Sequence, residues 1–510
     1  MALGFKWTIC SYVGGDTAVH QAYKPYLVLR PEPEDYAIGE IQVQPRGGGS
    51  ITVSGLGFRP SVIMLVSFRP RAANGTSDTA FGDRGGGMTY GAAGYESSVV
   101  TEWDSGTTYG IGDQVSHNGQ WVATAVHSGS EPPSANWAQV GTVQFTGGAK
   151  HRHAFNTHHS TWREDSCLSV LFTSGVEVLR LELASLDADG FTLNQAINLY
   201  DQVDYVAWVA LRGNYKTGIM EAGDTSIGSF SGTPTGAVFL STKFLSGEVG
   251  TVKYSDWDYM QGLAGQNDQN VVWGGHVTSS WNYSTERWQD DAAILLCKAA
   301  IGSAFYGAEV EAKGVVSSWH PGGIDLQWPI FNNEAYRIGY VLTDDPAEAG
   351  YLETSWGTRP GGEFTEEDGY MFQPTTIRPE VILMTGTNYN FSYANTDPYD
   401  RPRSPDEFQP GAGAGLGWHA APFLSSGADA YGVHTYQNAV AERGHYVNSG
   451  TIYARGCILA GQGANSNPPA QHQHGVNILD WPRIVGMNWR SADRRGANIR
   501  GLQNVSDVTP

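Results

Sequence analysis

Short apolar runs that follow proline-marked turns are the main repeating feature of the chain. Three of them begin in the same way, at residues 57–65, 233–240 and 377–384. Each run is nearly continuous in apolar residues and too short for a typical helix. This pattern is typical of a strand that is buried on both faces. It therefore predicts three related β-strands.

Three further landmarks follow each of these strands in the same order. The second landmark is an apolar strand with one cysteine, at residues 165–172, 292–297 and 454–459. The third is a strand that opens with glycine or histidine-glycine, at residues 189–193, 322–326 and 474–479. The fourth is a closing apolar strand, at residues 204–211, 335–342 and 483–489. Four ordered landmarks in three copies predict an internal repeat.

The repeated unit is predicted to be an antiparallel β-sandwich, because short strands joined by Gly and Asp turns bury an inner face between two sheets. The fold class is therefore all-β, with three tandem antiparallel β-sandwich modules and a small three-stranded β insert in the first. Polar or Gly-rich stretches at residues 221–225 and 357–362 are the predicted linkers. The predicted divisions are an N-terminal attachment segment (1–47), three modules (48–213, 228–345 and 370–491) and a C-terminal tail (492–510).

A different pattern interrupts the first module over residues 100–142. Asn118-Gly119, between two strand patterns, is a strong signal for a tight β-hairpin. A series of aromatic, Gly-Asp and Glu-Pro landmarks surrounds it. In order along the chain these are Trp103, Tyr109, Gly112, Asp113, Val115, Trp121, Glu131, Pro132 and Trp137.

This order of residues resembles the small carbohydrate-binding modules of bacterial chitinases and cellulases. The resemblance covers the insert alone, and it implies a glycan groove, since sugar rings stack on flat exposed aromatic rings. Tyr109 and Trp121 are the candidate platform, with His127 at its rim. The chain departs from the family pattern at Val126 and His127, where chitin-binding members carry aromatic residues. The alternative is that the insert's aromatic rings form only the core of a very small domain.

The sandwich repeats, with their Gly-Phe-x-Pro openings and Asp-Gly-Phe-x-Leu strands, resemble modules in minor tail proteins of tailed bacteriophages. This resemblance spans most of residues 48–491. It implies a structural protein of the virion tail, in contact with other tail proteins and often a homotrimer. With the insert, it implies adhesion to a host cell-surface polysaccharide. Two alternatives remain open: a secreted carbohydrate-active enzyme with an internal binding module, and a fibre that decorates the head.

Composition and charge narrow the partners. Gly at 65 residues and aromatics at 12%, against 16% charged residues, favour many short strands over disorder. Lys and Arg number 31 against 51 Asp and Glu, a net charge of −20, which disfavours binding to nucleic acid. No apolar stretch is long enough to predict membrane insertion. Residues 1–7 lack the pattern of a signal peptide, so we expect synthesis in the host cytoplasm and localisation in the virion.

The search for chemistry gives only weak candidates. The four cysteines are far apart in the sequence, and three lie in apolar strands, so buried free thiols are expected. His472 and His474, two apart on one strand, could chelate a metal, as could His151 and His153, but no carboxylate or cysteine stands at ligand spacing beside them. The Asp187–Gly190 segment is predicted to be a hairpin turn rather than a calcium loop. No catalytic motif is present, so we expect neither enzymatic activity nor a cofactor.

Overall fold

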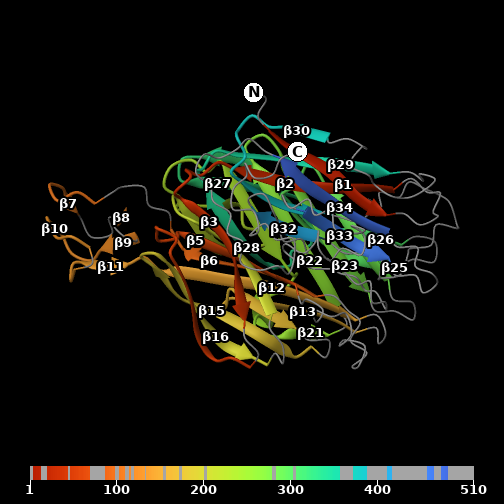
Figure 1. The fold of residues 1–510 in the computed structure, drawn as a ribbon, viewed down its shortest axis with the longest axis horizontal. Helices are drawn as coiled ribbons and strands as arrows, with labels where there is room; N and C mark the ends of the chain where they lie inside the picture. The colour runs from red at the N-terminus through yellow and green to blue at the C-terminus, as the bar shows by residue number, and fades with distance from the viewer. Residues whose placement is uncertain are drawn as a thin grey trace.

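The computed structural model is built from β-strands, as predicted from the sequence. It describes residues 4–12, 20–43, 46–68, 87–97, 103–109, 114–116, 120–132, 134–152, 157–171, 175–199, 204–254, 256–277, 283–301, 306–356, 371–386, 411–415, 457–463 and 472–480. Within these residues, the one helical element is a short 3₁₀ turn, η2, at Ser246–Glu248. All named strand pairs are antiparallel, and together they form several separate sheets (Figure 1).

Unit 1 is a sandwich of two sheets. Its larger sheet has the order β21-β13-β12-β6-β5-β17-β3, and its smaller sheet has the order β14-β15-β16-β4. The strands of the larger sheet are β3 (Tyr36–Val43), β5 (Val62–Phe68), β6 (Gly87–Tyr95), β12 (Thr142–Arg152), β13 (Thr157–Arg163), β17 (Asp204–Leu211) and β21 (Val252–Tyr254). Those of the smaller sheet are β4 (Gly49–Ser54), β14 (Leu168–Leu171), β15 (Glu177–Asp187) and β16 (Gly190–Asn198).

Unit 2 is a sandwich with the same strand order. Its larger sheet runs β18-β28-β20-β22-β23-β24, and its smaller sheet runs β19-β27-β26-β25. The larger sheet contains β18 (Tyr215–Glu221), β20 (Gly236–Ser241), β22 (Asp256–Gly265), β23 (Gln269–Val277), β24 (Tyr283–Gln289) and β28 (Arg337–Thr343). The smaller sheet contains β19 (Ser226–Ile227), β25 (Ile294–Ile301), β26 (Tyr306–His320) and β27 (Gly323–Phe331). The ten strands of each unit can be numbered along the chain if the insert strands β7–β11 and the edge strand β21 are left out. Both units then follow the order 1-10-3-4-5-6 in one sheet and 2-9-8-7 in the other.

Unit 3 consists of two four-stranded sheets, with the orders β29-β2-β31-β32 and β30-β1-β34-β33. Six of its strands come from the last third of the chain: β29 (Ala347–Trp356), β30 (Met371–Pro374), β31 (Val381–Gly386), β32 (Gly411–Gly415), β33 (Cys457–Gly463) and β34 (His472–Asp480). The other two, β1 (Gly4–Tyr12) and β2 (His20–Leu29), come from the start of the chain. They occupy the places that the ninth and tenth strands hold in units 1 and 2.

The register of the larger sheets repeats along one row of residues. In unit 1 the row runs Gly39, Trp208, Leu65, Gly91. In unit 2 it runs Gly218, Tyr340, Phe239, Gly262, and in unit 3 Gly350, Tyr26, Met384, Gly413. Each row therefore places an aromatic residue of the tenth strand opposite a glycine of the first. A side chain at Gly218 or Gly350 would run into the facing Tyr ring, so the glycine makes room for the aromatic residue.

These pairings place the units differently from the predicted divisions. The predicted starts at residues 48, 228 and 370 each leave out the first strand of a unit, because β3, β18 and β29 precede them. Residues 221–225, predicted to be a linker, are the turn between β18 and β19 inside unit 2. The predicted attachment segment, residues 1–47, contributes strands to units 3 and 1, and its attachment role stays a prediction. The predicted closing strand at residues 483–489 and the tail at 492–510 lie outside the described residues.

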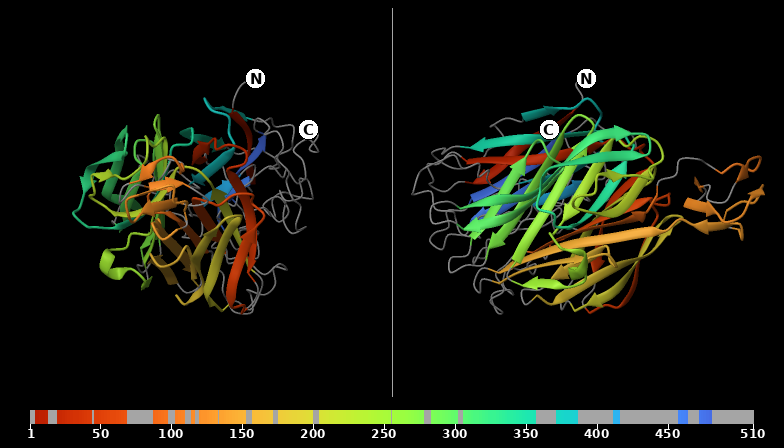
Figure 2. Two further views of the ribbon diagram at one scale, coloured as in Figure 1. Left: turned by 90° about the vertical axis from the view of Figure 1, so that its left-hand side faces the viewer. Right: turned by 180° about the vertical axis from the view of Figure 1, so that it is seen from behind.

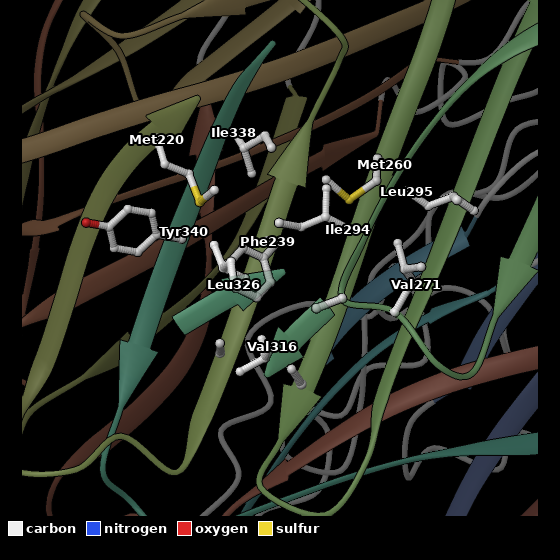
Figure 3. Packing of buried hydrophobic residues seen from close by; sticks show 14 of the residues in the cluster. Met220, Phe239, Met260, Val271, Ile294, Leu295, Val316, Leu326, Ile338 and Tyr340 are labelled. Atoms are coloured by element: carbon white, nitrogen blue, oxygen red, sulfur yellow. The ribbon is translucent and has the colours of Figure 1, made fainter. Parts of the chain in front are cut away.

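Apolar residues from both sheets fill units 1 and 2. In unit 1, Trp208 of the larger sheet meets Phe191 of the smaller one edge to face, with ring centroids 5.4 Å apart. In unit 2, Phe239 and Met260 of the larger sheet face Ile294 and Leu326 of the smaller one (Figure 3). The third strands are buried on both faces at residues 62–66, 236–241 and 381–383, as their continuous apolar runs predict, and the inner parts of the tenth strands are buried in the same way.

The larger sheets of the three units face one another. β6 and β12 of unit 1 lie against β18 and β22 of unit 2, β29 of unit 3 lies against β22 and β23, and β17 lies against β32. Between units 1 and 2, the rings of Tyr90 and Tyr259 stack with centroids 5.4 Å apart. Seen along its long axis, the protein is a triangle of three sheet pairs around a common centre (Figure 2).

Candidate carbohydrate-binding site

The insert leaves unit 1 between β6 and β12 on a short antiparallel stem. Tyr95 and Thr142 are cross-strand partners, and the Glu96 N–H donates to the Gly141 carbonyl at 3.0 Å. Beyond this stem, the insert projects from one end of the protein and is separate from the three sheet pairs (Figures 1 and 2). It is thus displayed where a large ligand can reach it.

A three-stranded sheet forms the insert, as predicted, together with a two-stranded ribbon. The sheet has the order β11-β9-β8, with β8 (Gln114–Ser116), β9 (Gln120–Ala123) and β11 (Trp137–Gln139). The ribbon pairs β7 (Thr108–Tyr109) with β10 (His127–Ser128). β8 and β9 pair with Ser116 opposite Gln120, in the register of the predicted hairpin, whose tip lies outside the described residues.

Tyr109 is in the core of the insert. Its side chain is 4% exposed and packs with Val115 and Ala123. Its hydroxyl accepts a hydrogen bond from the Asp104 N–H at 2.6 Å and lies 3.3 Å from the Asp104 carbonyl. A ring buried to this degree cannot stack on a sugar unless the insert opens. This burial favours the core alternative for Tyr109.

Trp121 and His127 are both partly buried, and each borders this core. Trp121 lies on the middle strand of the sheet, opposite Val115 on one side and Gln139 on the other, and packs against the core. His127 is the cross-strand partner of Tyr109, with ring centroids 5.8 Å apart and the rings tilted by 39°. The two candidates therefore retain exposed surface that Tyr109 lacks.

Trp103 is a further partly buried ring at this core. It belongs to the sequence motif but not to the candidate platform of Tyr109 and Trp121. The turn after it is fixed by Asp104. One oxygen of the Asp104 carboxylate accepts from the Gly106 N–H at 3.2 Å and the other from the Thr107 hydroxyl at 2.9 Å. These two hydrogen bonds lower the pKa of Asp104. The carboxylate thus holds the turn in place at any pH near neutrality.

Val126 departs from the family pattern, and its side chain is 69% exposed just before β10. An aromatic residue there would extend a platform into solvent, and valine offers much less flat surface. The candidate rings that keep some exposed surface are therefore Trp121 and Trp103, with His127 as a further partly buried ring.

The histidine candidates for a metal site lie on two other strands. His472 and His474 are both on β34, where His474 is opposite Ser11 of β1 and Ala460 of β33. His151 is opposite His158 on β13, and His153 lies outside the described residues. Within the described part of the chain, no group of three or more His, Cys, Asp or Glu side chains is placed to hold a metal ion.

Two predictions about local chemistry are confirmed. The segment Asp187–Gly190 is the turn between β15 and β16, and Asp189 accepts hydrogen bonds from the Gly55 and Gly57 N–H groups at 2.9 and 2.6 Å. Cys167 and Cys297 are buried and form no disulfide, and the side chains of Cys10 and Cys457 lie outside the described part of the structure. Burial also raises the pKa of the Cys167 thiol, which makes it unreactive.

In comparisons with known proteins, no family model, no curated protein and no solved structure matches the chain. Among the described residues, no helix is long and apolar enough to cross a membrane.

Proposed function

We propose that the protein is a structural component of a bacteriophage tail that contacts host-surface glycan through the insert. The observation that carries this proposal is the position of the insert, which stands on its own stem at one end of a large β-sheet body. Such a display suits a polymeric ligand on a surface. In this role the protein acts without catalysis, works in the virion and contacts other tail proteins, and a homotrimer stays a prediction.

The proposed contact surface is small. Trp121 supplies the main stacking ring, Trp103 extends it, and His127 lies at its rim. Tyr109 lies in the core of the insert, as the cross-strand partner of His127, and so helps to position the site. A small surface of this kind gives weak binding per copy, which repeated copies on one particle strengthen through avidity.

Retention on insoluble polysaccharide tests the proposal. The full chain, a chain with residues 100–141 replaced by a short Gly-Ser linker, and W121A are each mixed with chitin, cellulose and bacterial cell-wall material. The full chain should be retained on at least one of these materials, the chain without the insert should not be retained, and W121A should be retained less than the full chain. Equal retention of all three proteins would exclude the insert as the contact.

The location in the virion needs a second measurement. Gold-labelled antibodies against the chain, imaged on phage particles by electron microscopy, should mark the tail. Label on the capsid would instead support the head-fibre alternative. Release of reducing sugar from the bound polysaccharide would support the enzyme alternative.

A further inference from the structure

Unit 3 is incomplete without the first strands of the chain. β2 lies between β29 and β31, pairing with β29 from His20 to Leu29 and with β31 from Tyr26 to Leu29. β1 lies between β30 and β34 in the other sheet. If β1 and β2 were absent, both sheets of unit 3 would be divided in two. We call these two strands, β1 (Gly4–Tyr12) and β2 (His20–Leu29), the clasp.

The inner half of β2 is as deeply buried as the closing strands of the other units. Tyr26, Leu27, Val28 and Leu29 are each 2% exposed or less. They correspond through the register to residues 208–211 of β17 and 340–343 of β28. Burial on both faces means that this strand is part of the interior rather than a surface arm.

The segments that join the units meet at one end of the protein. These three linkers, residues 30–35, 212–214 and 344–346, together form what we call the hub. Each pair of linkers is directly bonded. The Arg30 N–H donates to the Pro346 carbonyl at 2.9 Å, the Arg212 N–H donates to the Asp35 carbonyl at 2.7 Å, and the Asn214 amide donates to the Asp344 carboxylate at 2.6 Å.

A second backbone hydrogen bond, between the start of the third strand and the end of the tenth, recurs in every unit. The N–H groups of Ser61, Thr235 and Glu380 donate to the carbonyls of Leu211, Thr343 and Leu29, at 2.7, 2.7 and 3.0 Å. The bond in unit 3 therefore joins the clasp to the C-terminal part of the chain as closely as the other units are joined internally. The residue before the first linker, Leu29, is thus held in the same way as Leu211 and Thr343, which precede the other two linkers.

We propose that the clasp is the strand donor that closes the three units into a ring within a single chain. Its binding site is the double gap in unit 3, between β29 and β31 and between β30 and β34, and its occupant is the same chain's own N-terminal part. The three larger sheets then cover one another inside one molecule. A homotrimer would consequently be an assembly of closed rings, because in the described part of the chain both gaps of unit 3 are filled by the same chain's own strands.

Engineered cross-links in the full chain test this closure. Ala22 of β2 is opposite Thr354 of β29, and the neighbouring pair is Gln21 with Ser355. Adjacent antiparallel pairs alternate between a closer and a wider Cα separation, so A22C/T354C and Q21C/S355C together include the favourable one. Both double variants are made in a chain in which Cys10 and Cys457 are changed to Ser. After oxidation, non-reducing gels show whether a cross-link lies within one chain or between two, and light scattering measures the oligomeric state.

The expected result is a cross-link within one chain, seen as a monomer band of shifted mobility. The matched control is V43C/D204C, the equivalent pair of unit 1, whose two strands belong to one unit along the chain. Cross-linked dimers or larger species from the clasp pairs would show that the strands are exchanged between copies. Failure of both clasp pairs where the control pair reacts would show that the clasp is not in unit 3. Either result overturns the proposal, and neither bears on glycan binding by the insert.

Discussion

The Tyr215 hydroxyl donates a hydrogen bond to the Asp345 carboxylate, and this bond joins the first residue of β18 to the linker at residues 344–346 of the hub. The pKa of Asp345 is raised to about 6, mainly by burial and also by the nearby carboxylates of Asp344, Asp35 and Glu32, against the lowering effect of the hydrogen bond from Tyr215. The hub therefore gathers acidic groups that take up protons more readily in the folded protein than in the unfolded chain.

The stability of the protein should consequently increase when the pH falls from 8 to 5.5. A carboxyl with a raised pKa binds its proton in the folded state first, so stability is lost as the pH rises through about 6. Glu380, whose pKa burial raises to about 7, extends this window upward. Two pKa units at Asp345 correspond to on the order of 3 kcal/mol at most.

Thermal unfolding at pH steps between 5.5 and 8 checks this expectation. D345N should flatten the dependence of Tm on pH, because Asn keeps an acceptor for Tyr215 but does not titrate. D104N is the control, because the pKa of Asp104 is lowered and lies below the window. A wild-type Tm that rises with pH over this range would contradict the prediction.

Gly262, the last residue of the cross-strand row in unit 2, should not tolerate a side chain. A Cβ at Gly262 would overlap the backbone carbonyl of Ala293, which belongs to the opposite sheet and cannot turn away. We expect G262A to lower the free energy of unfolding by about 2–3 kcal/mol, as overpacking typically does. G228A should be close to neutral, since nothing lies within 4 Å of the added methyl group. Chemical denaturation of both variants measures the difference, and equal midpoints would contradict the close approach of the sheets.

In the insert, replacements of Tyr109 and Trp121 should have different effects. Y109A removes a buried ring and the hydroxyl that bonds Asp104, so the insert should unfold while the Tm of the body stays unchanged. W121A should keep the insert folded and reduce polysaccharide affinity about fivefold, since one stacking contact contributes about 1 kcal/mol. Protease sensitivity of the insert and pull-down yield separate the two effects. Loss of the fold in W121A would identify Trp121 as core as well.

A charged contact joins units 1 and 2. The Arg337 guanidinium donates to both oxygens of Glu164, at 2.6 and 2.9 Å, and these side chains are 19% and 25% exposed. A double-mutant cycle with R337A and E164A should give a coupling energy of about 1–3 kcal/mol in thermal unfolding. The pair Arg163–Asp165, in which the Asp165 side chain is 59% exposed, is the comparison, with an expected coupling below about 1 kcal/mol. Equal couplings would mean that the contact between the units contributes little.

The sequence predicts the strands well where their residues are buried on both faces. The runs at residues 62–66 and 208–211 are apolar on every position because neighbouring units cover their outer faces, and this is visible without a structure. The burial of Tyr109 was not predictable, because a motif aromatic can serve as core or as platform and only packing decides between them.

The completion of unit 3 could not be read locally either. The strand that opens Gly4-Phe5 resembles the one that opens Gly190-Phe191, but its partners lie more than 300 residues away in the chain. Contacts at such a distance, such as that between Tyr36 and Glu380, leave no trace in local periodicity. A search of the N-terminal residues for the last two landmarks of the repeat would have found the likeness.

The position of the clasp has a consequence for synthesis on the ribosome. About 450 residues separate Leu29 from Asp480, where the described part of unit 3 ends. At translation rates of about 5–20 residues per second, the clasp waits roughly 20–90 s for the described part of unit 3 to be made. During that time, units 1 and 2 can fold in order of emergence, while an apolar strand at the start of the chain stays without its sheet. We therefore expect the clasp to stay unpaired until the strands of unit 3 have left the ribosome.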